Sequence, residues 1–494
     1  MTTTTAENAP STPAAARNYR PEVLYLLVFF SGFANLATEI IGPRMLASLF
    51  GTTTVVWAIM ISVTLVGLSV GYAIGGRIKL EHIHTFLPSI LATNAGWLLI
   101  ISWIVWQVPA DAVASGVRVD ASLIFTVAMA GFFIPSVLFG MTSPIAITLL
   151  GQGRKPEAIS TIVGNIYALS TVGSVAGALG AAFILIPWVG LSPSVQVFAA
   201  GLVLFAAYFW WDRRRPMVAA MLIACVLFPQ PDWQWTGQDD MTLLAQQEGY
   251  YQTIRVYEDG NERIMNLGPT NHSRVDMDTL EPTFNYAVDM VAMSEQRFLD
   301  LTGKRALILG AAGHGIAHGL ENRGAIVTEV EIDPFVAELS DEYFGEIQGE
   351  TIIQDGRIYM ELVEENTFDL ILIDVFDAAA NVPPQFVTQE FFQATQQALT
   401  DEGLVVFNFV GTPQGQRSRS FKAVATTLQA VFDYVGADDL SGDTSENIIL
   451  VAANSEPDGF DLLTPPDEGV LLTDNRNPIE IFTLEARDFA YFRR

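Results

Sequence analysis

Long apolar segments fill the first half of this 494-residue chain and constrain its fold more than any other feature. Crossing the hydrocarbon core of a bilayer as a helix takes about 20 apolar residues. Six segments reach this length, at residues 23–48, 54–76, 83–107, 119–149, 158–188 and 193–211. A seventh, Met217–Phe228, has 12 residues, and the sequence leaves open whether it crosses the membrane or lies at its surface. We therefore expect a transmembrane domain of six or seven helices over residues 21–229.

The composition supports this interpretation, because only 16% of the residues are charged, whereas soluble domains carry about 25%. Residues 1–20 form a tail that is rich in Thr, Ala and Pro and is predicted to be disordered. This tail lacks the basic start of a secretory signal peptide. The chain has a single cysteine, Cys225, which excludes an intrachain disulfide and a cysteine-based metal site.

Basic residues gather at alternate connections between the apolar segments. They are Arg17 and Arg20, Arg77 and Lys79, Arg154 and Lys155, and Arg213–Arg215. If six helices alternate, all of them fall on one side, and the positive-inside rule makes that side cytoplasmic. The N-terminus is therefore predicted to be cytoplasmic. The following half of the chain is cytoplasmic if the seventh segment does not cross the membrane, and outside if it does.

The two halves of the chain differ in charge. Residues 1–216 carry 11 basic and 8 acidic residues, a net charge of +3, whereas the remainder carries 15 basic and 46 acidic residues, a net charge of −31. A field this negative repels nucleic acid and attracts cations. A requirement for solubility, or a salty habitat, would explain the same negative charge. The charge alone therefore does not identify a ligand.

Two further patterns lie inside the membrane half. Gly173 and Gly177 form a GxxxG pattern, which lets helices pack closely. Glu39 and Arg44 lie within or near the end of the first apolar segment, where charged residues are functional candidates by default. The alternative is an interfacial ion pair between these two residues that fixes the end of the helix.

Residues 230–248 are polar and are predicted to form a linker. Two alternating runs follow, Thr253–Glu258 and Glu262–Leu267, on either side of the turn sequence Asp259-Gly260-Asn261. This pattern is typical of a β-hairpin. We expect a small β-hairpin or lid element over residues 249–300.

After residue 300 the pattern changes to strands that alternate with helices. Strands are predicted at residues 305–309, 325–331, 351–354, 368–373 and 403–409. This alternation indicates a doubly wound α/β domain with a mostly parallel sheet, here residues 301–494. Ligands of such domains bind beyond the carboxyl ends of the strands.

The residues at three of these strand ends suit a nucleoside. A glycine-rich turn follows the first strand and lets the backbone approach a ligand closely. Its glycines are Gly310, Gly313 and Gly315. Glu331 ends the second strand, 21 residues after the first of these glycines, where an acidic residue accepts hydrogen bonds from ribose hydroxyls. Asp355-Gly356 ends the third strand, where a carboxylate accepts the exocyclic amine of adenine, although Asp-Gly is also a common turn sequence.

Two carboxylates, Asp374 and Asp377, flank the end of the fourth strand. Together they can hold a cationic amine and take its proton, and an unprotonated amine is a nucleophile. The alternative is a structural role as a helix cap.

These motifs resemble the polyamine aminopropyltransferase (spermidine synthase-like) family, over roughly Gly249 to Phe409. The sequence TEIIGPRML in the first apolar segment and the glycine-rich fifth segment with Tyr167 resemble its bacterial membrane-bound type. The resemblance implies a Rossmann-like (SAM-methyltransferase-like) domain. The residues that it implies for binding the co-substrate are Gln252, Gly310, Gly313, Gly315, Glu331, Asp355 and Gly356. The catalytic residues that it implies are Asp374 and Asp377.

The resemblance also suggests substrate contacts and shows departures from the family pattern. The substrate candidates are His272, Tyr251 and Tyr286. Where the family has an Asp that contacts the aminopropyl group, this chain has Gly313, followed by His314. The family's Asp-Ser-Ser-Asp-Pro is replaced by Asp374-Val-Phe-Asp377-Ala, which weakens the case for putrescine as the acceptor.

The resemblance implies transfer of a 3-aminopropyl group from decarboxylated S-adenosylmethionine to a small cationic amine, with release of methylthioadenosine and without a metal. Two alternatives stay open. The same pocket could use ordinary S-adenosylmethionine for methyl transfer, elimination or cyclisation. The bundle could instead transport or sense a polyamine, with Glu39 as the cation contact and the soluble domain as a regulator.

The expected location is a bacterial cell membrane, with several spans. The bilayer is the expected partner besides the amine, nucleic acid is not, and a homodimer is one option. Because co-substrates of this kind are made in the cytoplasm, the soluble domain is expected there.

Overall fold

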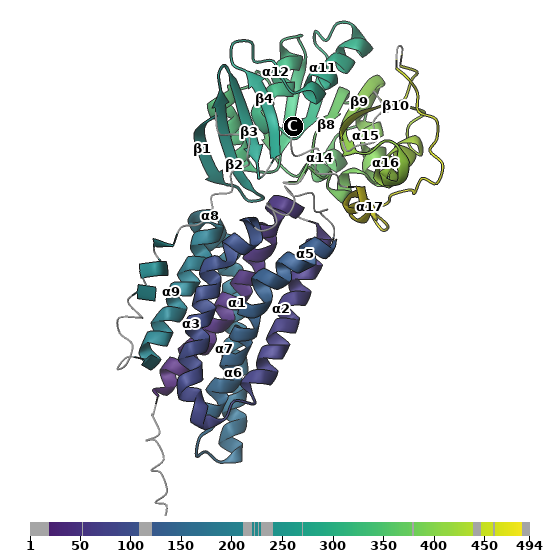
Figure 1. Ribbon diagram of the computed structural model, residues 1–494. Coiled ribbons are helices and arrows are strands. Elements are labelled where there is room, and N and C mark those ends of the chain that lie inside the picture. Colours follow the sequence, from purple (N-terminus) through teal and green to yellow (C-terminus); the bar gives the residue numbers. More distant parts are fainter. Residues whose placement is uncertain are drawn as a thin grey trace, which may run out of the picture.

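A helical bundle and an α/β region that stands on one end of it make up the computed structural model (Figure 1). The residues that it describes are 19–51, 53–107, 121–210, 220–228 without 222 and 226, 241–268, 270–377, 380–437, 446–457 and 460–486. Most of the predicted tail and residues 229–240 of the predicted linker lie outside these ranges.

The bundle is built from the predicted apolar segments. Within the described ranges, six helical stretches are long and apolar enough to cross a membrane, at Pro21–Ala47, Thr54–Gly75, Leu80–Gln107, Ala121–Gly151, Pro156–Val189 and Leu191–Trp210. Their helices are α1 (Pro21–Phe50), α2 (Thr54–Gly75), α3 (Leu80–Ser102), α5 (Ala121–Ala128), α6 (Ile134–Gly151), α7 (Pro156–Gly180), α8 (Ile186–Val189) and α9 (Leu191–Trp210). Short π-helical turns continue α3 and join α5 to α6 and α7 to α8.

Small residues let α7 lie directly on α1. A β-carbon added at Gly173 would lie 2.3 Å from the carbonyl oxygen of Phe29, and one at Gly177 would lie 2.1 Å from that of Phe33. No larger side chain fits at these distances. The GxxxG pattern is therefore a helix-packing face.

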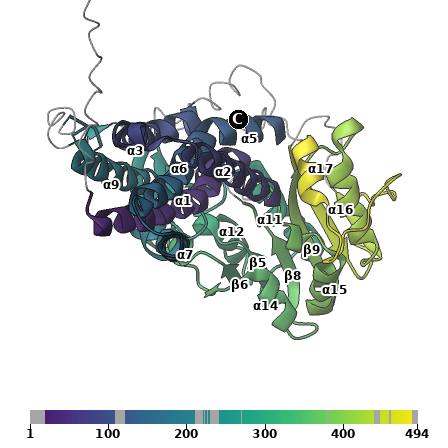
Figure 2. The ribbon, with the colours of Figure 1, turned by 90° about the horizontal axis from the view of Figure 1, so that it is seen from below.

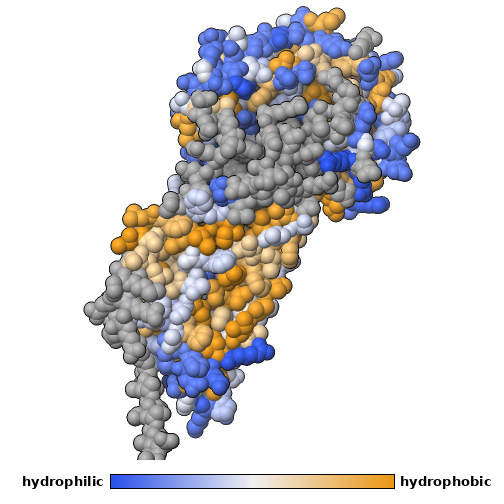
Figure 3. All heavy atoms as spheres, in the orientation of Figure 1, coloured by the Kyte–Doolittle hydropathy of each residue, from blue (hydrophilic) through white to orange (hydrophobic). Residues whose placement is uncertain are grey.

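The bundle has a lower pole, far from the α/β region, and an upper pole beneath it (Figure 1). At the lower pole the Tyr19 ring contacts the rings of His84, at the start of α3, and Phe209, at the end of α9. Figure 3 shows polar surface at this end, below a broad apolar band. The described basic residues that flank the helix ends here are Arg20, Arg77, Lys79, Arg154 and Lys155. The other basic residues of the predicted cluster, Arg17 and Arg213–Arg215, lie outside the described ranges.

The described part of the seventh apolar segment ends at the upper pole. Its described residues lie within 220–228, and Cys225 is buried in the bundle core. The carbonyl of Phe228 accepts a 3.1 Å hydrogen bond from Nε2 of Gln196, in the first turns of α9. Helix α9 ends at the lower pole with Trp210, whereas Phe228 lies beside its first turns at the upper pole. The α/β region therefore stands at the pole opposite the basic connections.

The β-rich element is a four-stranded antiparallel sheet in the order β1-β2-β3-β4. Its strands are β1 (Thr242–Glu248), β2 (Thr253–Asp259), β3 (Glu262–Leu267) and β4 (Thr270–Asp276). The predicted hairpin is β2–β3, and Gly260 in its turn has a φ of +63°, which glycine adopts easily. The expected start of this element at residue 249 is wrong, because β1 already pairs with β2 from Thr242 onward. β1 is a half-exposed edge strand, so its polar sequence resembles a linker.

The large sheet has seven strands in the order β10-β11-β9-β8-β5-β6-β7. They are β5 (Arg305–Leu309), β6 (Ile326–Glu331), β7 (Glu350–Ile353), β8 (Phe368–Ile373), β9 (Leu399–Gly411), β10 (Tyr434–Ala437) and β11 (Glu446–Ala453). The neighbouring strands β9, β8, β5, β6 and β7 pair in parallel. β11 runs antiparallel to both of its neighbours, β9 and β10. The expected doubly wound, mostly parallel α/β domain is confirmed.

Helices cover both faces of this sheet. They are α11 (Asn285–Phe298), α12 (Gly315–Glu321), α13 (Pro334–Phe344), α14 (Gly356–Leu362), α15 (Gln389–Ala398), α16 (Arg419–Gln429) and α17 (Ile479–Ala486). One core joins α11 and α12 to the sheet, and a second joins α14, α15 and α16 to its other face. Seen from below, the α/β region extends well to one side of the bundle (Figure 2).

Candidate active site

A cavity of about 460 Å³ lies between the carboxyl ends of the parallel strands and the upper pole of the bundle. Small-molecule sites typically have volumes of about 300–1,000 Å³. The predicted site residues that line it are Tyr251, Gln252, His272, Gly310, Glu331, Asp355, Gly356, Asp374 and Asp377. The fold thus brings most of the predicted site together, from six separate stretches of the chain.

The glycine turn after β5 combines close packing with an approach to this cavity. Gly310 has a φ of +97°, and a β-carbon there would lie 2.4 Å from the carbonyl oxygen of Asp374, so only glycine fits. Gly313 and Gly315 do not line this cavity, although Gly315 lines a smaller hollow beside it, and their role in binding the co-substrate stays a prediction. Gly313 instead packs on Ser273 of β4, whose Oγ a β-carbon would meet at 2.7 Å. Gly315 begins α12 beside the same strand.

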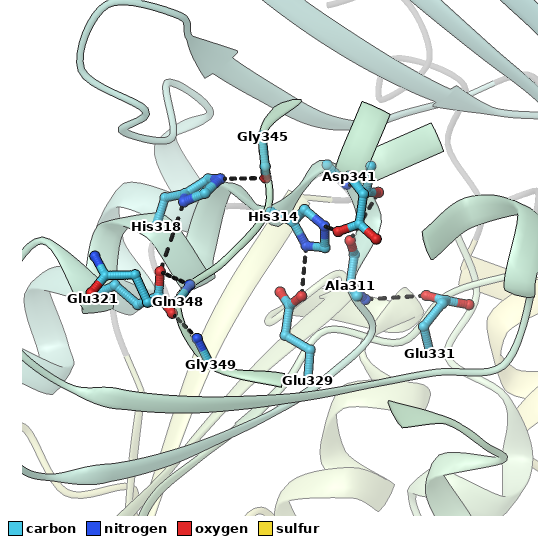
Figure 4. A network of polar contacts seen from close by, with 12 residues as sticks. Ala311, His314, His318, Glu321, Glu329, Glu331, Asp341, Gly345, Gln348 and Gly349 are labelled. Atoms are coloured by element: carbon cyan, nitrogen blue, oxygen red, sulfur yellow. Dashed lines mark hydrogen bonds and ion pairs between the residues drawn. The ribbon is translucent and has the colours of Figure 1, made fainter. Parts of the chain in front are cut away.

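Glu331 ends β6 in the cavity wall and is 8% exposed. Its Oε2 accepts a 3.1 Å hydrogen bond from the N–H of Ala311 (Figure 4), and its Oε1 accepts one of 2.8 Å from the N–H of Asp333. Burial raises the pKa of Glu331 to about 7. The carboxylate ties the glycine turn to the end of β6 and keeps further lone pairs for hydroxyl donors in the cavity.

Asp333 is a cavity residue that the sequence analysis missed. Its Oδ1 caps α13 by accepting from the N–H of Phe335 at 3.1 Å, and its Oδ2 accepts from the N–H of Tyr251 at 3.4 Å. The Tyr251-Gln252 pair is thereby fastened to the end of β6. An Asp-Pro sequence at a helix start signals the cap, but nothing local signals the second contact.

Asp355 follows β7 and caps α14. Its Oδ1 accepts the N–H groups of Arg357 and Ile358 at 2.8 and 3.2 Å. Because both bonds use Oδ1, the lone pairs of Oδ2 are left for a donor in the cavity. Asp355 therefore caps α14 and also lines the cavity.

Asp374 follows β8 and borders the cavity. Its Oδ1 accepts a 2.8 Å hydrogen bond from Nδ2 of Asn408 in β9, and the Tyr286 hydroxyl lies within hydrogen-bond reach of the same carboxylate. Burial raises the pKa of Asp374 to about 6, although both donors act against this rise. Such a carboxylate is ionised at neutral pH and is still basic enough to take a proton. The sequence analysis missed Asn408, although a polar residue within an apolar strand is a usable signal.

Asp377 closes the loop after β8. Its carboxylate accepts from the backbone N–H of Asn381 at 3.0 Å and from Nδ2 of the same residue at 2.9 and 2.8 Å. The side chain therefore braces a loop rather than a helix end. It also lines the cavity and adds to its negative wall.

A much smaller hollow, of about 10 Å³, shares His272 and Asp374 with the main cavity. It has about the volume that one water needs. Burial lowers the pKa of His272 to about 4, so this imidazole is neutral at neutral pH. Tyr286 lines the smaller hollow, and its hydroxyl donates to the carbonyl of His272 at 2.6 Å. Its single proton serves either this carbonyl or Asp374 at one time.

A buried ion network supports the glycine turn (Figure 4). Nδ1 of His314 lies 2.6 Å from Oε2 of Glu329, and Nε2 lies 3.1 Å from Oδ1 of Asp341. Burial by itself lowers the pKa of His314, but the two carboxylates outweigh it, and the net pKa is raised. His314 thus bridges two carboxylates at the turn where Gly313 and His314 both have positive φ values, of 64° and 52°. This network occupies the place where the chain departs from the family's glycine motif.

The wall opposite the strand ends comes from elements that lie far away in the sequence. Thr53 and Thr54 connect α1 to α2, and the N–H of Thr54 lies 3.2 Å from both carboxylate oxygens of Glu480 in α17. These three residues and Thr483 line the cavity. No sequence signal pointed to them, because the contact joins residues 426 positions apart.

The ion pair between Glu39 and Arg44, one of the two alternatives for these residues, is not among the contacts in the described part of the chain. Arg44 donates to the carbonyls of Gly249 and Tyr250, and Glu39 bonds to Thr64. The first apolar helix therefore contacts the α/β region directly.

Fold and site together define a class of protein, in which a doubly wound α/β domain presents a glycine turn and a row of carboxylates to a cavity that can hold a nucleoside. The model of the Spermine/spermidine synthase domain matches residues 288–437. The polyamine aminopropyltransferase of Vibrio vulnificus is 24% identical over 254 residues, which cover 49% of this chain and 81% of that protein. The similarity to the spermine/spermidine synthase family thus lies in the α/β region.

Two further proteins are similar to this chain. Polyamine aminopropyltransferase 2 of Aquifex aeolicus is 21% identical over 410 residues, which cover 78% of this chain and 78% of that protein. Because the α/β region is only about half of the chain, this alignment reaches into the helical half. A probable spermidine synthase from Corynebacterium glutamicum is similar in structure, with a TM-score of 0.39, 24% identity, and coverage of 43% of this chain and 80% of that one.

Proposed function

We propose that this protein transfers a 3-aminopropyl group from decarboxylated S-adenosylmethionine to a small cationic amine. The observation that carries the proposal is the convergence of Glu331, Asp355 and Asp374, from three strand ends, on one cavity of about 460 Å³. Carboxylates in the wall favour both the sulfonium of the co-substrate and a positively charged acceptor. The family match supports the same class of reaction.

The cavity residues fit this co-substrate. Glu331 offers acceptors to the ribose hydroxyls, Oδ2 of Asp355 offers one to the exocyclic amine of adenine, and Gly310 leaves the backbone open to close approach. When bound, the co-substrate supplies an electrophilic carbon next to its sulfonium.

The chain's own residues orient the amine and take its proton. As the new carbon–nitrogen bond forms, the carbon–sulfur bond breaks, and methylthioadenosine leaves. Asp374 accepts the proton that the amine gives up, and Asn408 holds the carboxylate in place. Asp377 adds negative charge at the same cavity. Orientation of the two reactants supplies much of the remaining rate enhancement.

Mass spectrometry of the products tests this reaction against its alternatives. We expect aminopropylated amine and methylthioadenosine when the purified protein is given decarboxylated S-adenosylmethionine and a panel of amines. Methylated products, or breakdown of ordinary S-adenosylmethionine, would assign the pocket to the alternative chemistry. Amine uptake into proteoliposomes by Asp374→Asn protein would support a transporter.

We further propose that the α/β region stands on the extracytoplasmic face of the membrane. The upper pole, where this region stands, and the lower pole, where the described basic residues lie, are at opposite ends of helices such as α2. The 22 residues of α2 span about 33 Å. The positive-inside rule assigns the basic pole to the cytoplasm. A cytoplasmic domain was expected because the co-substrate is made there, but the arrangement of the poles favours the other alternative. In this orientation the substrates reach the site from outside.

Cysteine labelling tests this orientation. In a Cys225→Ser background, an exposed residue of each pole is changed to cysteine, Glu365 in the α/β region and Glu157 at the start of α7. A membrane-impermeant maleimide added to intact spheroplasts should label the Glu365→Cys variant and spare the Glu157→Cys variant until the membrane is permeabilised. The reverse pattern would place the α/β region in the cytoplasm.

A further inference from the structure

Arg44 links the transmembrane bundle to the wall of the cavity. It lies near the upper end of α1, and its guanidinium donates from Nη1 to the carbonyl of Tyr250 and from Nη2 to the carbonyl of Gly249, the latter at 3.2 Å. The carboxylates of Glu248 and Asp333 act on it electrostatically. A planar guanidinium suits two neighbouring carbonyl acceptors, whereas a lysine ammonium offers a single point charge.

The two carbonyls belong to a tight turn whose next residues line the cavity. The N–H of Gly249 donates to the carbonyl of Gln252 at 2.9 Å and closes the turn. A β-carbon on Gly249 would lie 2.3 Å from Oδ2 of Asp333, so the turn packs directly on this carboxylate. The same oxygen accepts from the N–H of Tyr251. Arg44 therefore hydrogen-bonds to the turn from the bundle side, and Asp333 hydrogen-bonds to it from the side of the large sheet.

A second contact places the bundle at the cavity. The N–H of Thr54, at the start of α2, meets the Glu480 carboxylate of α17, and both residues line the cavity together with Thr53. The upper pole thus contributes side-chain surface to the cavity and also holds the turn that carries Tyr251 and Gln252.

We propose that the membrane bundle is a working part of the nucleoside site rather than an anchor alone, and that Arg44 is its positioning residue. Arg44 holds the turn at residues 249–252 so that Gln252 and Tyr251 face the nucleoside. This inference rests on the proposed function in that it takes the ligand of the cavity to be an adenosine thioether.

Binding of methylthioadenosine to the full-length protein in detergent tests the proposal. Isothermal titration calorimetry should show at least tenfold weaker binding for Arg44→Met and a smaller loss for Arg44→Lys, which keeps the charge but reaches one carbonyl. Arg77→Met is the matched control at the lower pole, where the guanidinium donates to the carbonyl of Ala73 in the last turn of α2, and its binding should be unchanged. In turnover assays, the KM for the nucleoside co-substrate should rise in the Arg44 variants while the KM for the amine stays within twofold.

The outcomes separate this inference from the proposed function. If the wild type binds methylthioadenosine and Arg44→Met binds it within twofold, the bundle is an anchor only, and the inference is overturned. If the wild type binds no adenosine thioether, the proposed function fails first. If Arg44→Met does not fold, Arg44→Lys decides, because its KM for the nucleoside rises only if the turn is held by two bonds.

Discussion

Replacing Asp374 with asparagine is expected to lower turnover by about 10²–10⁴-fold, the usual contribution of a general base. Asparagine has the same shape, so the loop after β8 keeps its position, but the amide cannot take the proton of the amine. The contact with Asn408 survives, since an amide oxygen still accepts its hydrogen bond. Initial rates at saturating amine and nucleoside measure the effect, and binding of methylthioadenosine should change by less than threefold.

The pH profile of the wild type provides an independent check on this role. Burial raises the pKa of Asp374 to about 6, so the carboxylate is protonated and inactive below that pH and ionised above it. Turnover should therefore rise with pH through about 6 and then level off. Asp401→Asn, at an exposed carboxylate of β9, is the matched control and should keep wild-type turnover. A loss of less than tenfold in Asp374→Asn would contradict the assignment of the base.

The parts of the fold that the sequence predicts well are those with a strong local period. Apolar runs of about 20 residues define the membrane helices, and the alternation of strands and helices after residue 300 defines the large sheet. β1 escaped prediction because an edge strand with one exposed face has no apolar pattern. The short seventh segment was ambiguous because its packing against α9 depends on tertiary contacts such as that of Phe228 with Gln196.

In the candidate site, too, the residues that could be predicted are those with a local sequence signal, and those that depend on distant contacts could not. Glu331, Asp355 and Asp374 could be predicted because each follows a strand, and parallel strands bring their carboxyl ends to one edge. The packing of Gly313 could not be predicted, because a glycine motif gives no hint of which glycine lines the cavity and which packs on β4. Glu480 could not be predicted, because its contact with Thr54 arises only when the C-terminal helix meets the bundle.

Replacing Glu331 with glutamine is expected to weaken binding of methylthioadenosine by about 10–100-fold. Hydrogen bonds to charged groups contribute about 1.5–3 kcal/mol each, and about 1.4 kcal/mol corresponds to a factor of ten in Kd. The carboxylate serves the N–H groups of Ala311 and Asp333 with its two oxygens, whereas an amide has a single oxygen. The variant therefore loses both an acceptor for the ribose and one support of the glycine turn. Calorimetry at pH 8, where the wild-type carboxylate is ionised, measures the effect.

Glu329→Gln separates ribose binding from stability, because Glu329 is a buried carboxylate on the same strand that lies outside the main cavity. This variant keeps an acceptor for Nδ1 of His314, so the glycine turn stays in place and binding should stay near the wild-type value, but the weaker hydrogen bond should lower the melting temperature. The pKa of Glu331 is raised to about 7, so wild-type binding should weaken as the pH falls from 8 to 6 and the acceptor is protonated. Binding by Glu331→Gln should not change across this interval. Equal losses of binding in the two variants would mean that Glu331 acts through stability alone and does not hold the ribose.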